Sequence, residues 1–245
     1  MSEHTNTKIA IRFLKIMMEY IQKSELRSLL EEIQYTANQN SEPPDPFRIL
    51  ISTVLSVRNR DESTHIAIVN LFDYGGLNTP EKLRDAPIEV IEELIRKSGM
   101  YKTKAKWIKE ISQILLEKHD GIVPQDMIDL LGLPGVGRKV ANCVRVFAFK
   151  LPAIPVDTHV HRLSNRMGLI KTKTPEETEK KLTQIYPEQY WLDVNRTFVV
   201  FGKLICKPIG PLCDRCPLKE GCPKLFQKNP SNKSSTRRKQ SRKVI

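Results

Sequence analysis

Apolar residues recur along this chain with the 3.6-residue period of an α-helix. Near the start, one helical face carries five apolar residues: Ile9, Phe13, Ile16, Met17 and Tyr20. Strict alternation of apolar and polar residues, the pattern of a half-buried strand, is hard to find in any segment bounded by turn residues. The pattern therefore predicts an all-α fold.

Capping residues mark several of the expected helix starts. Thr174-Pro175-Glu176-Glu177 places a hydroxyl at the N-cap, a proline at the first helical position and a glutamate three residues after the cap. Thr79-Pro80-Glu81 repeats this device, and Ala86-Pro87-Ile88-Glu89 resembles it. The other expected helical segments are residues 9–20, 88–97, 104–119, 125–131 and 139–149, and one that aligns Val160, Leu163 and Met167.

Composition excludes several classes of protein. The chain has 245 residues, of which 40% are hydrophobic and 28% charged, so it is neither a small disulfide scaffold nor a largely disordered chain. The longest stretch without an acidic or basic residue runs from Ser63 to Phe72, far short of the ~18–20 apolar residues of a membrane span. The first residues lack the apolar region of a secretory signal. We therefore expect a cytoplasmic location in a reducing compartment, with the five cysteines as thiols or metal ligands.

The net charge of +12 points to a polyanionic partner, either nucleic acid or an anionic membrane surface. Residues 227–245 carry seven basic residues and no acidic one, which leaves +5 for residues 1–226. This segment is expected to be a disordered basic tail, either a solvated end of no specific role, an arm that helps to bind nucleic acid, or a localisation signal. The prolines at 43, 44 and 46 predict a domain boundary near residue 42.

Four of the five cysteines form the most specific motif: Cys206, Cys213, Cys216 and Cys222. The loops between them are rich in Pro and Gly, so the chain can wrap tightly about one centre. Zinc sites usually pair their ligands as two short Cys-x2–4-Cys units, whereas this chain has one short pair flanked by gaps of six and five residues. The spacing favours a [4Fe-4S] cluster over zinc, and a reducing compartment argues against two disulfides.

The second motif is a glycine hairpin between two expected helices, Leu133-Pro134-Gly135-Val136-Gly137-Arg138-Lys139. Its glycines permit positive φ and leave backbone N–H groups bare beside a helix N-terminus, which suits a DNA phosphate. The alternative is an ordinary turn between two helices. Lys139 is a cation in the first turn of the second helix, where repulsion by the helix dipole favours the neutral amine that a nucleophile needs. The alternative role for Lys139 is a phosphate contact.

The third motif runs from Pro155 to Arg162 and contains Asp157 directly before an expected helix. Asp157 is first interpreted as the N-cap of that helix. Its carboxylate is also suited to stabilising a cationic transition state or to exchanging protons with an amine, and these roles are compatible with capping.

These three motifs, in this order and at these separations, resemble the endonuclease III family of DNA glycosylases and lyases over roughly residues 30–225. The resemblance implies two helical domains with a DNA-binding cleft between them. One is a helical barrel of six helices with the helix-hairpin-helix over residues 42–150, and the other is a cluster domain made of residues 1–41 and 151–226. It also implies damaged double-stranded DNA as the partner, no membrane, a monomer, and a place at the nucleoid, or in the nucleus of a eukaryotic host.

The resemblance further implies a mechanism. A damaged base, here an oxidised pyrimidine, is flipped into the cleft, neutral Lys139 attacks C1′, and Asp157 supports the developing positive charge. The resulting Schiff base permits β-elimination, which cuts the strand 3′ to the abasic site. Gly135, Val136, Gly137 and Arg138 are implied to contact the DNA backbone.

Two loops match the family's DNA-reading segments, one around Arg58 and one around Met100. At the gap-filling position many relatives have glutamine where this chain has Arg58, and at the wedge position a common leucine is replaced by Met100. The first cysteine loop carries a single basic residue, Lys207, where relatives are often more basic, and Arg215 and Lys219 are candidates to compensate.

Two alternatives stay open on sequence grounds. One is a mismatch-specific glycosylase of the same superfamily, although such relatives lack lysine at position 139. The other is a non-catalytic helix-hairpin-helix DNA-binding module with a structural metal. Of the remaining residues, Cys143 is expected to be a small core residue, His159 and His161 to have surface or capping roles, and Trp107 to anchor the core.

Overall fold

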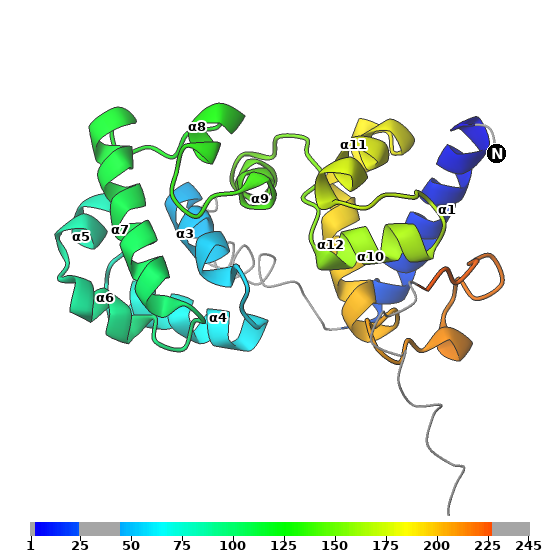
Figure 1. The fold of residues 1–245 in the computed structure, drawn as a ribbon, viewed down its shortest axis with the longest axis horizontal. Helices are drawn as coiled ribbons and strands as arrows, with labels where there is room; N and C mark the ends of the chain where they lie inside the picture. Colours follow the sequence, from blue (N-terminus) through cyan, green and yellow to red (C-terminus); the bar gives the residue numbers. More distant parts are fainter. Residues whose placement is uncertain (1–2, 25–44, 227–245) are drawn as a thin grey trace, which may run out of the picture.

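The computed structural model describes residues 3–24 and 45–226 as two groups of helices that lie side by side (Figure 1). Within these ranges the chain forms helices and no strand, which confirms the all-α prediction. None of the helices in the described ranges is long and apolar enough to cross a membrane. The expected boundary near residue 42 and the basic tail lie outside the described residues.

The first group is continuous in sequence and surrounds a core that extends from Phe47 to Ala153. Its longest helix, α7, packs against α5, α6 and α3, while α9 packs against α3 and α8. The helices of this group are α3 (Pro46–Ser56), α4 (Asp61–Val69), a π-helical turn (Asn70–Tyr74), α5 (Pro80–Asp85), α6 (Ile88–Leu94), α7 (Tyr101–Lys118), α8 (Met127–Leu131) and α9 (Arg138–Phe149).

The second group joins the N-terminal helix to the last third of the described chain. Its core takes residues from Ala10 to Ile21 and then from Ile154 to Leu218, so the chain passes from one core to the other between Ala153 and Ile154. The buried Tyr186 hydroxyl donates to the Ala10 carbonyl at 3.2 Å. The elements are α1 (Glu3–Gln22), α10 (Thr158–Arg166), α11 (Pro175–Ile185), a 3-10 turn (Glu188–Tyr190), α12 (Trp191–Leu204) and a second 3-10 turn (Cys213–Arg215).

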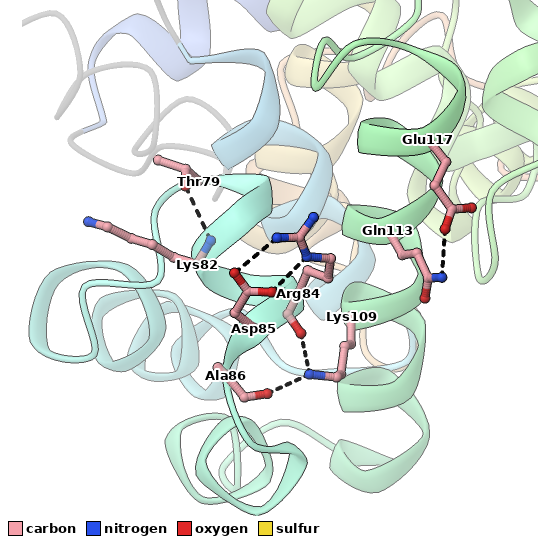
Figure 2. Close-up of polar contacts among 8 residues, drawn as sticks. All are labelled: Thr79, Lys82, Arg84, Asp85, Ala86, Lys109, Gln113 and Glu117. Atoms are coloured by element: carbon pink, nitrogen blue, oxygen red, sulfur yellow. Dashed lines mark hydrogen bonds and ion pairs between the residues drawn. The ribbon is translucent and has the colours of Figure 1, made fainter.

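The expected caps are present at several helix starts. Thr174 Oγ1 accepts the backbone N–H of Glu177 at 3.2 Å, and Thr79 Oγ1 accepts that of Lys82 at 3.4 Å (Figure 2). Helix α7 begins at Tyr101, three residues before the start expected from apolar periodicity. Its N-cap residue, Met100, has a left-handed backbone with φ 60°, which ends the preceding turn. The caps could be predicted from sequence, whereas this start carries no capping side chain.

Lys109 of α7 ties the end of α5 to α7 (Figure 2). Its amino group donates to the backbone carbonyls of Arg84 and Ala86, the latter at 2.5 Å. These carbonyls belong to the last turn of α5 and its C-cap, where lysine side chains commonly satisfy the free acceptors. The guanidinium of Arg84 itself pairs with Asp85 at 2.7 Å, and this hydrogen bond lowers the pKa of the exposed carboxyl group.

Candidate active site and metal centre

A cleft of about 690 Å³ is lined by residues from both groups of helices. It brings Lys139 of α9 together with Asp157, the N-cap residue of α10. From the first group its lining includes Arg58, Asn59, Asp61, Gly135 and Gly137, and from the second it includes His159, His161, Pro175 and Asn195. The two residues expected to carry the chemistry thus share one cavity although their helices belong to different cores.

Lys139 is the second residue of α9, whose N-cap is Gly137. The half-buried side chain interacts with the thiol of Cys143, one turn further along the same helix. Burial is the largest influence and lowers the pKa of Lys139, but Cys143, Asp157 and Asp61 together raise it by more. This differs from the expectation that the helix dipole leaves a neutral amine, because these neighbours favour the ammonium. We therefore expect Lys139 to carry a proton in the free protein.

Cys143 is completely buried in the first core, as expected of a small core residue. Burial and the nearby Asp157 raise the pKa of its thiol by more than Lys139 lowers it. Its contact with Lys139 was not anticipated from the sequence. The signal that could have found it is the spacing of four residues, which places both side chains on one face of α9.

Asp157 is the N-cap of α10, which confirms this interpretation of the sequence. Its Oδ1 atom accepts the backbone N–H groups of His159 and Val160, both at 2.9 Å. Both capping bonds go to one oxygen of the carboxylate, so Oδ2 takes no part in the cap, and the residue lines the cleft. The cap fixes the position of the side chain, and the carboxylate keeps its charge available toward Lys139.

The two histidines beside Asp157 are held by polar neighbours. His161 Nδ1 contacts Thr178 Oγ1 at 2.7 Å, and His159 Nδ1 lies 3.2 Å from a guanidinium nitrogen of Arg162. Burial lowers the pKa of His159. The contact of His161 therefore joins α10 to α11, whereas the contact of His159 lies within α10.

The glycine hairpin packs on Trp107, which belongs to the rim of the first core. Gly135 has φ +74°, and a Cβ atom at this position would lie 2.5 Å from Trp107 Cε3. A Cβ atom at Gly137 would meet nothing within 4 Å. In the described part of the chain neither glycine N–H donates to another group, so both stay available to an anion. Trp107 thus anchors the hairpin, in keeping with its expected core role.

The hairpin glycines provide a stability prediction with a built-in control. Gly135→Ala should lower the free energy of unfolding by about 2 kcal/mol or more, because the new methyl group meets an indole ring on a strained left-handed backbone. Gly137→Ala should change it by less than about 1 kcal/mol, since its surroundings are open. Urea denaturation of both variants measures the difference. Equal stabilities would show that Trp107 does not constrain the hairpin.

Two residues of the expected DNA-contacting set are placed differently from expectation. Val136 is 5% exposed, its side chain packs in the first core, and its N–H donates to the Leu133 carbonyl at 3.1 Å. Arg138 pairs with Glu179 of α11 at 2.7 Å, and this hydrogen bond raises the pKa of the guanidinium. Val136 therefore offers no free N–H group, and the guanidinium of Arg138 is engaged by the second group of helices.

Arg58 and Met100 are both exposed and both take a left-handed backbone, with φ 51° and 60°. Arg58 lines the cleft, and Met100 is 47% exposed. Their loops touch, since the backbone N–H of Gly99 donates to Asn59 Oδ1 at 3.3 Å. The structure thus places the two expected DNA-reading residues on adjoining loops, of which the Arg58 loop lines the cleft with Lys139.

The four cysteines of the spaced motif line one cavity together with Arg166, Phe201 and Leu218. Arg166 Nη1 donates to Cys206 Sγ at 3.5 Å and to the Lys207 carbonyl at 2.7 Å. Burial raises the pKa of Cys216 and Cys222, and the nearness of the other cysteines raises it further. A cationic centre is what would hold four such thiolates together.

The spacing of these sulfurs bears on the kind of centre they would hold. In the described ranges, no three Cys, His, Asp or Glu side chains converge closely enough to ligate a single metal ion. Four cysteines around a shared cavity, with a guanidinium donating to one sulfur, are donors of the type that a negatively charged iron–sulfur cube takes. The donor set therefore fits a [4Fe-4S] cluster.

The helical fold, the hairpin and the shared cleft define a helix-hairpin-helix protein of DNA repair. Residues 51–188 match the family described as the HhH-GPD superfamily of base excision DNA repair proteins. Within this superfamily, the chain belongs to the endonuclease III family. It is 51% identical over 197 residues to Endonuclease III of Thermotoga maritima, a match that covers 80% of this chain and 92% of the relative.

Solved structures agree with this assignment. A non-covalent Endonuclease III–DNA complex superimposes with a TM-score of 0.77 at 33% identity and covers 91% of this chain and 96% of that chain. A trapped Endonuclease III–DNA covalent intermediate matches with the same TM-score and identity, and it covers 91% of this chain and 97% of that chain. The resemblance noted from the motifs is confirmed.

Proposed function

We propose that this protein is a bifunctional DNA glycosylase and AP lyase of base excision repair that removes oxidised pyrimidines. The observation that carries the proposal is the cleft that holds Lys139 and Asp157 on opposite walls, beside the unpaired N–H groups of the hairpin. Membership of the endonuclease III family supports it, and a relative with a trapped covalent DNA intermediate supports the covalent route.

The first step is release of the base. The backbone N–H groups of Gly135 and Gly137 hold a phosphate while the damaged nucleotide turns out of the duplex into the cleft. Asp157 takes the proton from Lys139, and the neutral amine attacks C1′ as the bond from C1′ to the base breaks. The base leaves with that bonding electron pair and takes the proton that Asp157 had accepted, which restores the Asp157 carboxylate. The carboxylate side of the cleft stabilises the positive charge that develops on the sugar.

The second step cuts the strand. The sugar ring opens to a Schiff base between Lys139 Nζ and C1′, which makes the C2′ proton acidic. Loss of that proton expels the 3′ phosphate by β-elimination, and water then hydrolyses the imine to regenerate the amine. Arg58 fills the gap left by the flipped nucleotide and Met100 wedges between stacked bases. Arg138 contacts the backbone once it leaves Glu179, and Val136 supports the hairpin from within.

The two cores support a division into a barrel domain over residues 42–150 and a cluster domain made of residues 1–41 and 151–226. Because one chain supplies both walls of the cleft, the protein acts as a monomer. Its place of action is wherever the DNA is, at the nucleoid in the cytoplasm or in a nucleus. Cys206, Cys213, Cys216 and Cys222 would hold a [4Fe-4S] cluster, and the bound cluster would crosslink a segment that is poor in regular structure.

Iron content provides the test of the cysteine centre. The purified protein should contain about four irons per chain and show the broad visible absorption of an iron–sulfur cluster. Cys213→Ser should lose both and lower the melting temperature, because a structural metal centre contributes directly to folding. Cys143→Ser is the matched control and should retain the iron, since Cys143 lies in the first core. A colourless protein with one zinc ion would contradict the assignment.

Borohydride trapping tests the activity. Incubated with a duplex that contains thymine glycol, the protein should release the base, cut the strand and become covalently linked to DNA when borohydride reduces the imine. A duplex with an adenine mismatch should give none of these products. Release of the mismatched base without trapping would indicate a mismatch-specific glycosylase, and binding without any product would indicate a non-catalytic module.

A further inference from the structure

Lys104 is a buried cation that the proposed mechanism does not use. In the described part of the chain, it is the one charged side chain among the fully buried residues, with 0% exposure. It lies in the first turn of α7, behind the loop that carries Met100. A buried ammonium without an acidic partner is costly, so its presence requires an explanation.

The partners of Lys104 belong to the two DNA-reading loops. Its Nζ atom donates to the backbone carbonyl of Leu55 at 2.7 Å and to Ser98 Oγ at 2.9 Å. Both partners are uncharged, and burial lowers the pKa of Lys104 to about 8. Leu55 lies near the end of α3, just before the loop of Arg58, and Ser98 lies two residues before Met100.

Further hydrogen bonds connect the same two loops around Lys104. The Ser98 hydroxyl donates to the Leu55 carbonyl at 3.1 Å. Asn59 Nδ2 donates to Ser98 Oγ at 3.3 Å, and Asn59 Oδ1 accepts the N–H of Gly99 at 3.3 Å. We call this set, Leu55, Asn59, Ser98, Gly99 and Lys104, the loop clamp. It joins segments some forty residues apart, where the chain leaves α3 and where it enters α7.

The loop clamp adjoins both strained residues of the cleft rim. Arg58 precedes Asn59, and Met100 follows Gly99, so each left-handed residue is bonded directly to a member of the clamp. Non-glycine residues keep such a backbone only where the surroundings hold it, and such positions concentrate at functional sites. The clamp is the structure in contact with both of them.

We propose that Lys104 is a positioning residue that fixes the Arg58 and Met100 loops relative to each other, so that both side chains enter damaged DNA together. This inference rests on the proposed function, since it takes Arg58 and Met100 as DNA-reading residues. Lys104 itself is fully buried and acts through Leu55 and Ser98. Lysine has a long side chain and several N–H donors, so it can bond to two acceptors from the buried side of the loops.

Lys104→Met tests this with little risk to the fold. Methionine keeps the apolar stem and loses the ammonium. The Leu55 carbonyl still accepts from Ser98, and Ser98 still accepts from Asn59, so no buried acceptor loses its last partner. Lys118→Met is the matched control, because it makes the same change at an exposed position in the last turn of the same helix. Ser98→Ala disturbs the clamp from the other side and should act in the same direction as Lys104→Met.

We expect Lys104→Met to slow single-turnover release of thymine glycol from a duplex by about ten- to a hundredfold, the loss typical of small misplacements. Cleavage at an abasic site in single-stranded DNA, where no gap needs filling, should stay at the wild-type rate. A 2-aminopurine opposite the lesion, which brightens when it is unstacked, should brighten less on binding of this variant than on binding of the wild type. Lys118→Met should match the wild type in all three measurements.

Combining Lys104→Met with substitutions in the two loops distinguishes a positioning role of Lys104 from a general effect on stability. In a background with both Arg58→Ala and Met100→Ala, Lys104→Met should cause little additional loss, because the residues through which it acts are already gone. Fully additive losses, equal slowing on both substrates, or a wild-type rate for Lys104→Met would each overturn the inference. Failure of the wild type to form a borohydride-trapped complex would instead overturn the proposed function. The 2-aminopurine signal depends on binding alone and would still report on the clamp.

Discussion

Replacing Lys139 by glutamine should leave a protein that binds damaged duplex DNA but releases no base and forms no borohydride-trapped complex. Glutamine retains a polar side chain but has no basic amine, so it cannot form an imine with C1′. We expect a loss of at least about 10⁴-fold in single-turnover rate, in the range seen when a covalent nucleophile is removed. Binding should persist, because the hairpin N–H groups belong to the backbone of Gly135 and Gly137.

The control for this substitution is Lys150→Gln, at the other end of the same helix. It makes the same chemical change at an exposed C-cap position and should leave trapping unchanged. Gel separation of the trapped complex and a filter-binding titration measure the two properties independently. If Lys139→Gln were trapped at the wild-type rate, another amine would be the nucleophile and the proposed roles of the cleft residues would have to be reassigned.

Asp157→Asn should bind DNA like the wild type and react about 10²- to 10³-fold more slowly. The asparagine carbonyl can still accept from the N–H groups of His159 and Val160, so the cap survives. The negative charge is lost, and with it the acceptor for the Lys139 proton and the stabilisation of the cationic sugar. Single-turnover kinetics with excess enzyme measure this effect without a contribution from product release.

The same position separates capping from catalysis. Asp157→Ala removes the cap as well and should lower the free energy of unfolding by a further ~1 kcal/mol relative to Asp157→Asn, with a similar loss of rate. Thermal denaturation of both variants provides the comparison. A wild-type rate in Asp157→Asn, accompanied by lower stability in Asp157→Ala, would show that the carboxylate is a capping group and has no chemical role.

Local signals in the sequence were sufficient to predict the helix caps, because a cap depends on residues within one turn of the chain. Thr79 and Thr174 cap their helices as predicted, because a hydroxyl, a proline and the following N–H groups all lie within one turn. Asp157 caps α10 for the same reason. The resemblance placed Lys139 and Asp157 on one cleft, whereas the hairpin and the cap on their own would each have been compatible with a structural role.

The remaining features depend on contacts between distant segments. Helix α12 is buried on most of its faces from Val194 to Gly202, so it has no polar stripe from which its limits could be predicted. The Arg138–Glu179 pair joins residues that are 41 positions apart. Lys104 lies among other lysines in a helix with the composition of an exposed face, and its burial follows from how α7 packs against α3.

The way the chain enters and leaves its two cores has a consequence for biosynthesis. The first core uses an unbroken segment from Phe47 to Ala153, so it can form as soon as that segment has left the ribosome. Helix α1 is synthesised earlier, but its apolar face packs against α12 and α11, which come last. The apolar face of α1 therefore lacks these packing partners through most of translation. Among the helices of the described ranges, α1 therefore stays open to aggregation until α11 and α12 have been made, although it ends in the second core.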